Sequence, residues 1–428
     1  MQLLPYHLCL TLLLAAGSLS AQDRLSSYVR SNTHILNTVD PDSATDGDLA
    51  AIGLAIGDSR IVMLGEQDHG DAPTFLAKTR LIRYLHEKKG FNVLAFESDF
   101  FGLNEGWARL PRDRAAIDSF IRYNIFPIWT YCNTCQELFY SYIPASFRTA
   151  HPLQLAGFDC QMLLRYSRSH LVGWLDSVFH DLQLPVVNDP AYRGTVLPLL
   201  DSVTRRWYNW PGSPQDMAAA AKWFDTIAAQ AALRLDTEQK RTDFRWFVIH
   251  SLLDETKEYL NTGRLFQMSE ARDVSMAANL TWLTDVRYAG QKVIVWAADA
   301  HIGKAVGHFP EIGFYNRTPT MGSEFAGDPV HLAQTYVLGF TSFEGRAGRL
   351  TAKQYTLYRP RAGSFEHLFD KEVRYAFVDF RQYNVLNPDA DESFVLYGFR
   401  HVPVKGVWNK VFDGVLYIRE MYPCELVK

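Results

Sequence analysis

Four short apolar segments, each followed closely by an ionisable residue, constrain the fold of this 428-residue chain more than any other feature. Their hydrophobicity is continuous rather than alternating, which is typical of strands buried on both faces of a parallel sheet. The segments cover residues 61–65, 92–96, 153–158 and 292–297. We therefore predict an α/β fold with a mostly parallel core sheet and flanking helices.

The residues between the first two segments have helical spacing. Apolar side chains recur at this spacing over residues 74–88, and Gly90 then offers a helix stop. Strand, helix and strand in succession predict a βαβ unit. Residues 162–289 contain long stretches with a 3.6-residue period, so we expect a largely helical insertion before the fourth strand. Short β-like segments return near residues 336–340, 375–379 and 415–418.

The amino-acid composition indicates which kinds of molecule this chain can bind. The chain has 43 Lys plus Arg against 47 Asp plus Glu, and 47% of it is hydrophobic. This is enough apolar material for a folded core, and the near-neutral charge argues against nucleic acid as a partner. After the N-terminus no apolar run reaches the ~20 residues of a membrane-spanning helix. We expect a globular protein that binds a small molecule.

The N-terminus resembles a secretory signal peptide over residues 1–21. This stretch has no Lys, Arg, Asp or Glu, and its apolar core at residues 8–16 is followed by small residues at 17–21. Cleavage near Ser20 or Ala21 would export the protein to the periplasm or the medium. Because the stretch before the apolar core lacks Lys and Arg, an uncleaved hydrophobic first helix remains the alternative.

Four cysteines follow the predicted signal: Cys132, Cys135, Cys160 and Cys424. An exported protein is free to form disulfides, and four cysteines allow three pairings. Cys132 and Cys135 have the CxxC spacing of redox and zinc sites, but no second pair accompanies them. A local disulfide or two ordinary thiols is therefore the favoured interpretation.

Ionisable residues follow all four predicted strands, at the end where ligands bind in open α/β sheets. They are Glu66, Glu97, Asp159, and Asp299 together with His301; His69 follows Glu66 by three residues. Carboxylates and imidazoles gathered at one edge could serve general acid–base catalysis or metal binding. A single strand-terminal acid such as Asp159 could instead cap a helix or lie in a solvated loop. The aromatic residues Trp129 and Tyr131 could be core or could face a substrate.

An ordered set of motifs in this chain resembles the erythromycin esterase family. The opening motif is Gly65-Glu66-Gln67-Asp68-His69-Gly70, followed by Ala95-Phe96-Glu97 at the family's spacing. Further matches lie at residues 157–161, 272–279, 296–301, 321–323, 339–340, 363–366 and 412–417. The resemblance covers most of the chain and implies one hydrolase domain over residues 22–428.

The resemblance implies a hydrolase in which a histidine activates water against an ester carbonyl. By position, His69 matches the general base, Glu66 and Glu97 match two active-site carboxylates, and His301 matches a later histidine. The predicted substrate-binding residues are Lys78, Asp299 and Arg272. The chain departs from the family at two positions, with Lys78 in place of an arginine and Ala298 in place of a second histidine. Both departures weigh against macrolide lactones as substrates.

We expect a carboxylate to orient His69, whose free nitrogen then takes a proton from the attacking water. His301 or Lys78 would stabilise the oxyanion. No GxSxG motif supplies a serine nucleophile. The predicted substrate is a small ester or lactone and no cofactor is expected. The first alternative is a divalent-metal-dependent hydrolase that uses Glu66, His69, Glu97 and His301 as ligands. The second is a non-catalytic protein that binds a small ligand.

Overall fold

The computed structural model describes residues 21–205, 214–262, 270–305, 307–309, 317–391 and 393–427. Residues 1–20, which carry nearly all of the predicted signal peptide, lie outside these ranges. Within the described ranges no helix is long and apolar enough to cross a membrane.

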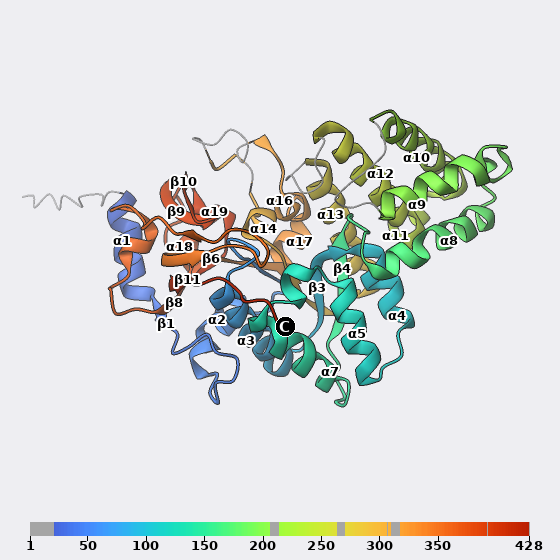
Figure 1. The fold of residues 1–428 in the computed structure, drawn as a ribbon. Helices are drawn as coiled ribbons and strands as arrows, with labels where there is room; N and C mark the ends of the chain where they lie inside the picture. Colours follow the sequence, from blue (N-terminus) through green and yellow to red (C-terminus); the bar gives the residue numbers. More distant parts are fainter. Residues whose placement is uncertain are drawn as a thin grey trace, which may run out of the picture.

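In the part of the chain that the structure describes, a mostly parallel sheet of nine strands forms the centre of the molecule (Figure 1). Its main path runs β1-β8-β11-β6-β2-β5-β3-β4, and β7 pairs with β6. All neighbours from β11 to β4 are parallel, whereas β8, β1 and β7 join in antiparallel fashion. The strands are β1 (His34–Ile35), β2 (Ile61–Leu64), β3 (Phe91–Asp99), β4 (Gln154–Asp159), β5 (Lys292–Trp296), β6 (Thr335–Ala347), β7 (Tyr355–Thr356), β8 (Tyr375–Asp379) and β11 (Gly414–Met421). The predicted α/β class is confirmed.

The four apolar segments form four adjacent strands, in the order β2-β5-β3-β4. Their registers are level, because Trp296 lies opposite both Leu64 and Phe96, and Phe96 lies opposite Gly157. Their carboxyl ends therefore reach the same edge of the sheet, and the ionisable residues that follow them are brought together there. The continuous hydrophobicity has the expected cause, since every residue of β2 is buried.

Helix α3 (Ala72–Lys89) connects β2 to β3 across the sheet. Pro73 occupies its first turn, and Gly90 ends it in the left-handed conformation (φ 74°), where its N–H bonds the Leu85 carbonyl. The helix buries Phe75, Leu81, Ile82 and Leu85 together with the polar residue Lys78. This places a lysine beneath the loop that leaves β2.

The described residues between 162 and 289 lie mostly in six helices: α8 (Arg165–Asp181), α9 (Leu197–Arg205), α10 (Pro214–Arg234), α11 (Thr237–Thr242), α12 (Phe244–Thr262) and α13 (Glu270–Trp282). Helices α8 to α12 gather at one end of the molecule, away from the sheet (Figure 1). Helix α13 returns to the sheet, where Asn279 Nδ2 donates to the Phe158 carbonyl at 3.1 Å. This return brings Arg272 and Asp273 to the carboxyl ends of the strands.

The other helices of the described ranges are short or peripheral. They are α1 (Ala21–Asn32), α2 (Ala50–Ile56), α4 (Trp107–Arg109), α5 (Arg114–Asn124), α6 (Pro127–Thr130), α7 (Ile143–Ser146), α14 (Asp299–Ile302), α16 (Met321–Phe325), α17 (Pro329–Gln334), α18 (Phe380–Leu386) and α19 (Trp408–Val411). A separate hairpin joins β9 (Phe394–Phe399) to β10 (Val402–Gly406).

A disulfide joins Cys132 to Cys424, 292 positions apart. The C-terminal tail runs beside the segment after α6, where Asn133 N donates to Glu425 O and Val427 N to Tyr131 O, each at 2.9 Å. The prediction for Cys132 was therefore wrong, because its nearest available thiol belongs to this tail and not to its CxxC partner. Cys135 and Cys160 are buried and do not take part in this disulfide.

Candidate active site

A cavity of about 530 Å³ opens at the carboxyl ends of the central strands. Its ionisable lining residues are His69, Glu97, Arg272, His301, Arg349 and Arg400. Aromatic and apolar lining residues include Phe126, Ile128, Trp129, Tyr131, Leu350 and Leu426. An apolar wall with a few convergent polar groups is typical of small-molecule sites.

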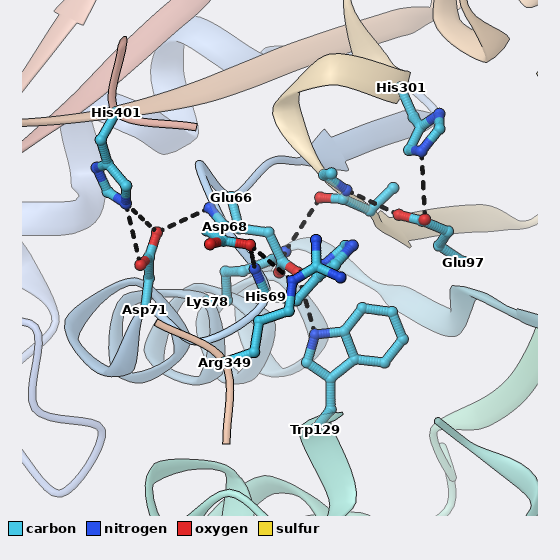
Figure 2. A network of polar contacts seen from close by, with 12 residues as sticks. Glu66, Asp68, His69, Asp71, Lys78, Glu97, Trp129, His301, Arg349 and His401 are labelled. Atoms are coloured by element: carbon cyan, nitrogen blue, oxygen red, sulfur yellow. Dashed lines mark hydrogen bonds and ion pairs between the residues drawn. The ribbon is translucent and has the colours of Figure 1, made fainter. Parts of the chain in front are cut away.

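The first of two polar networks in this cavity is centred on Glu66. This carboxylate is fully buried just after β2, and its Oε1 lies 2.7 Å from His69 Nδ1. Lys78 Nζ donates to Glu66 Oε2 at 2.6 Å from below (Figure 2). An ionised carboxylate only accepts, so Nδ1 of His69 carries the proton and Nε2 is left as a base. The His69 side chain is 14% exposed, which leaves it open to the cavity.

Trp129 completes this network from α6. Its indole N–H donates to Glu66 Oε1 at 3.0 Å, and its ring meets the His69 imidazole edge to face at 5.5 Å. Glu66 therefore accepts from three side chains, His69, Lys78 and Trp129, which fix its orientation. Trp129 both belongs to the core and lines the cavity, so the two alternatives predicted for it are true together.

The second network joins the ends of β3, β4 and β5 through Arg272 on α13. Arg272 Nη2 donates to Asp159 Oδ2 at 2.6 Å and to Glu97 Oε1 at 3.0 Å. His301 Nε2 lies 3.4 Å from Glu97 Oε1 (Figure 2), and its Nδ1 lies 2.8 Å from Asp273 Oδ1. The strand-terminal acid Asp159 is thus neither a helix cap nor a loop residue but a buried partner of Arg272.

The charges of this network shift the pKa values of its members. Burial by itself would raise the pKa of Glu97, but the positive charges of the nearby His301 and Arg272 hold it well below its usual range, and a protonated His69 would act in the same direction. Burial by itself would lower the pKa of His301, yet the carboxylates of Asp273 and Glu97 raise it above 6.5. Glu97 therefore stays ionised, and His301 keeps its proton to a higher pH than a free imidazole.

Two predicted substrate-binding residues lie beneath the cavity rather than in its wall. Lys78 is fully buried and its ammonium sits against Glu66 and over the Trp296 ring, 4.2 Å from the ring centroid. Asp299 is also fully buried, and its carboxylate accepts the Phe340 N–H at 3.1–3.2 Å. Neither belongs to the cavity lining, whereas Arg272 does. A role for Lys78 or Asp299 in direct substrate contact would need the site to rearrange.

The four residues of the alternative metal site divide between the two networks. Glu66 faces Lys78, and Glu97 faces Arg272, so each carboxylate already has a cation as its partner. Across the described ranges, no group of three or more His, Cys, Asp or Glu side chains could hold a metal ion. The geometry of these residues thus does not favour a divalent ion.

Several residues of the site were not among the predicted catalytic or substrate-binding residues. Asp273 orients His301 from α13, and Arg349 and Arg400 reach the cavity from loops after β6 and β9. Asp68, next to His69, accepts from Arg349 Nε at 3.0 Å. The sequence could have pointed to Asp273, because this residue lies in the matched motif at residues 272–279 and directly follows the predicted site residue Arg272.

This geometry defines an α/β protein with a histidine–carboxylate site at the carboxyl edge of a parallel sheet. The sequence model of the erythromycin esterase family matches residues 86–421. The chain belongs to the erythromycin esterase family, and this membership supports a hydrolase activity.

Two relatives are similar over nearly their whole length. "Putative hydrolase YbfO" of Bacillus subtilis (strain 168) is 25% identical over 97% of this chain and 96% of its own. "Erythromycin esterase type II" of Escherichia coli is 22% identical over 90% of this chain and 95% of its own.

Solved structures share the fold at low sequence identity. The match with a Bacillus cereus protein covers 95% of this chain and 99% of the Bacillus cereus chain, with a TM-score of 0.69 and 16% sequence identity. A variant of the erythromycin esterase EreC in its open conformation covers 91% of this chain and is itself covered to 98%, with a TM-score of 0.63 and 15% identity. At these sequence identities, both similarities show that the fold is shared and nothing further.

Proposed function

We propose that this protein hydrolyses a carboxylic ester or lactone with a water molecule activated by His69, without a covalent serine intermediate. One observation carries the proposal: His69 Nδ1 lies 2.7 Å from the buried carboxylate of Glu66, at the wall of the cavity. This contact leaves Nε2 as a base that is open to water. Similarity to "Erythromycin esterase type II" supports an ester bond as the target.

The reaction begins when water attacks the ester carbonyl and His69 Nε2 takes a proton from that water. Glu66 stabilises the imidazolium that forms, and Lys78 balances the charge of Glu66 from beneath. Arg272 and His301 line the same cavity and can stabilise the oxyanion of the tetrahedral intermediate. When that intermediate collapses, the His69 imidazolium returns the proton to the departing alkoxide.

A panel of ester and lactone substrates tests this proposal. The parent should turn over at least one of them, and Glu66→Gln should reduce kcat by about 10² or more, because the neutral amide no longer stabilises the imidazolium. A chelator such as EDTA should leave the parent rate unchanged. Turnover that survives Glu66→Gln would contradict the proposal, and binding without turnover of any panel member would favour a ligand-binding protein instead.

Protonated His301 should give the activity an alkaline limit. Because Asp273 and Glu97 raise the pKa of His301, its imidazolium persists above pH 6.5 and is lost as the pH rises further. Asp273→Asn removes one of these charges, so the pKa of His301 should fall and the alkaline limb of kcat/KM should move to lower pH. A pH–rate profile of both proteins measures the shift. An unmoved alkaline limb would exclude His301 as the titrating group.

We also propose that the protein is exported. The disulfide between Cys132 and Cys424 supports this, because disulfides persist in oxidising compartments. N-terminal sequencing of the protein from its native host should find a mature chain that begins near residue 22. A chain that still begins at Met1 in the cytoplasm would contradict export.

A further inference from the structure

The charges in the cavity wall are unequal. Glu97 is the only carboxylate among the described lining residues, against three arginines and two histidines. Glu97 is 3% exposed and already accepts from Arg272. Cationic side chains therefore outnumber carboxylates in the lining itself, and their buried partners decide which of them can meet a ligand.

Arg400 differs from the other two arginines of the wall. Arg272 pairs with Asp159 and Glu97, and Arg349 pairs with Asp68. Arg400 is exposed, and no ion pair or hydrogen bond joins its side chain to another residue of the described ranges. Its guanidinium is thus available to a ligand that enters the cavity.

The backbone places Arg400 at a position that rarely carries a large side chain. Phe399 pairs with Val402, so Arg400 and His401 are the two central residues of the hairpin turn between β9 and β10. Their φ angles are 49° and 55°, in the left-handed region that Asn and Gly favour in such turns. Large residues held in this region are concentrated at functional sites.

The turn is fixed to the loop that carries His69. His401 Nε2 lies 3.1 Å from Asp71 Oδ1, and its Nδ1 lies 3.0 Å from Ser342 Oγ (Figure 2 shows the contact with Asp71). Arg400 N donates to the Gln67 carbonyl at 3.1 Å. Gln67 and Asp71 flank His69 in the sequence. The backbone of the turn that carries Arg400 is therefore anchored to the same loop as the proposed base, while the guanidinium itself stays unpaired within the described ranges.

From this juxtaposition, and on the basis of the proposed ester hydrolysis, we infer that Arg400 binds an anionic group of the substrate. The substrate is then an ester of a molecule with a second acidic group, a carboxylate or a phosphate. Guanidinium suits both, because its planar donors match paired oxygens of either anion. Arg400 would set which ester binds, while His69 carries out the chemistry.

Matched esters test the inference. Mono-4-nitrophenyl adipate and 4-nitrophenyl 5-phosphonopentanoate carry an anion on the acyl side, and 4-nitrophenyl hexanoate is their neutral counterpart. On the alcohol side, 4-carboxyphenyl acetate is compared with 4-methylphenyl acetate. The parent should prefer the anionic member on at least one side. The kcat/KM of each anionic acyl ester is divided by that of the hexanoate ester. The larger ratio shows whether the site prefers a carboxylate or a phosphonate, which stands in for a phosphate.

Arg400→Gln should reduce the anionic-to-neutral ratio of kcat/KM about tenfold or more, since it removes a charge-assisted hydrogen bond. Arg400→Lys should retain part of the preference. The matched control is Arg359→Gln, because Arg359 is 76% exposed and pairs with Glu344 outside the cavity lining. It should leave the ratio unchanged. A parent without anionic preference on either side, or a ratio that Arg400→Gln does not alter, would overturn the inference.

A binding measurement separates this inference from the proposed function. Calorimetry on the full-length His69→Ala protein compares monomethyl adipate with methyl hexanoate, and needs no turnover. If no ester is hydrolysed but the anionic ester binds and Arg400→Gln abolishes that binding, the hydrolase proposal fails and the anion site stands. If esters are hydrolysed with equal affinity for both ligands, the anion site fails and the hydrolase proposal stands.

Discussion

Replacement of His69 by alanine is expected to reduce kcat/KM at least about 10²-fold, the effect of losing a general base. The fold should survive, because Glu66 keeps Lys78 and Trp129 as hydrogen-bond partners. Steady-state kinetics on a responsive ester, with circular dichroism of the same preparation, measures both effects.

His170→Ala is the matched control for this experiment. His170 is an exposed histidine on α8 that contacts the Tyr166 carbonyl at 3.0 Å, and it does not line the cavity. Its removal should leave kcat/KM unchanged. Parent-like turnover by His69→Ala would show that another group activates the water, and equal losses in both variants would indicate a general defect of folding.

The parts of the fold that follow from local pattern were predictable from the sequence. Continuous apolar segments that end in acids predicted β2 to β5, and the parallel sheet then brought Glu66, Glu97, Asp159 and His301 to one edge. This succeeded because two physical rules act together. Strands buried on both faces read as unbroken apolar runs, and parallel strands share their carboxyl edge.

Other contacts of the site were not predictable, because they come from segments without a helical or strand period. Trp129 reaches Glu66 from a four-residue helix, and Arg400 reaches the cavity from a two-residue turn. The Cys132–Cys424 disulfide depends on where the C-terminal tail runs, which no local pattern encodes. Sequence reasoning also could not tell which ionisable residues face the cavity and which balance charge beneath it, as Lys78 does.

Arg272 shows why that distinction matters, because it lines the cavity and also holds two buried carboxylates. Asp159 is fully buried and Glu97 is 3% exposed, and Arg272 bonds both. Breaking a buried pair by removing one partner costs more than the pair itself contributes, because the remaining charge is left without compensation. The loss of Arg272 should therefore destabilise the protein as well as weaken stabilisation of the oxyanion.

Arg272→Met is expected to lower the free energy of unfolding by about 3–5 kcal/mol, and urea denaturation with an unchanged m-value measures it. The double variant Arg272→Met with Asp159→Asn should lose less, because the single variant leaves the buried Asp159 carboxylate without a cation, whereas Glu97 keeps His301 beside it in both variants. Arg114→Met, which breaks an exposed pair with Asp118, should cost no more than about 1 kcal/mol. If Arg272→Met has the same midpoint of urea denaturation as the parent, the network of Arg272 does not stabilise the fold. A loss of turnover in that variant would then show that Arg272 acts on the substrate and not on the stability of the fold.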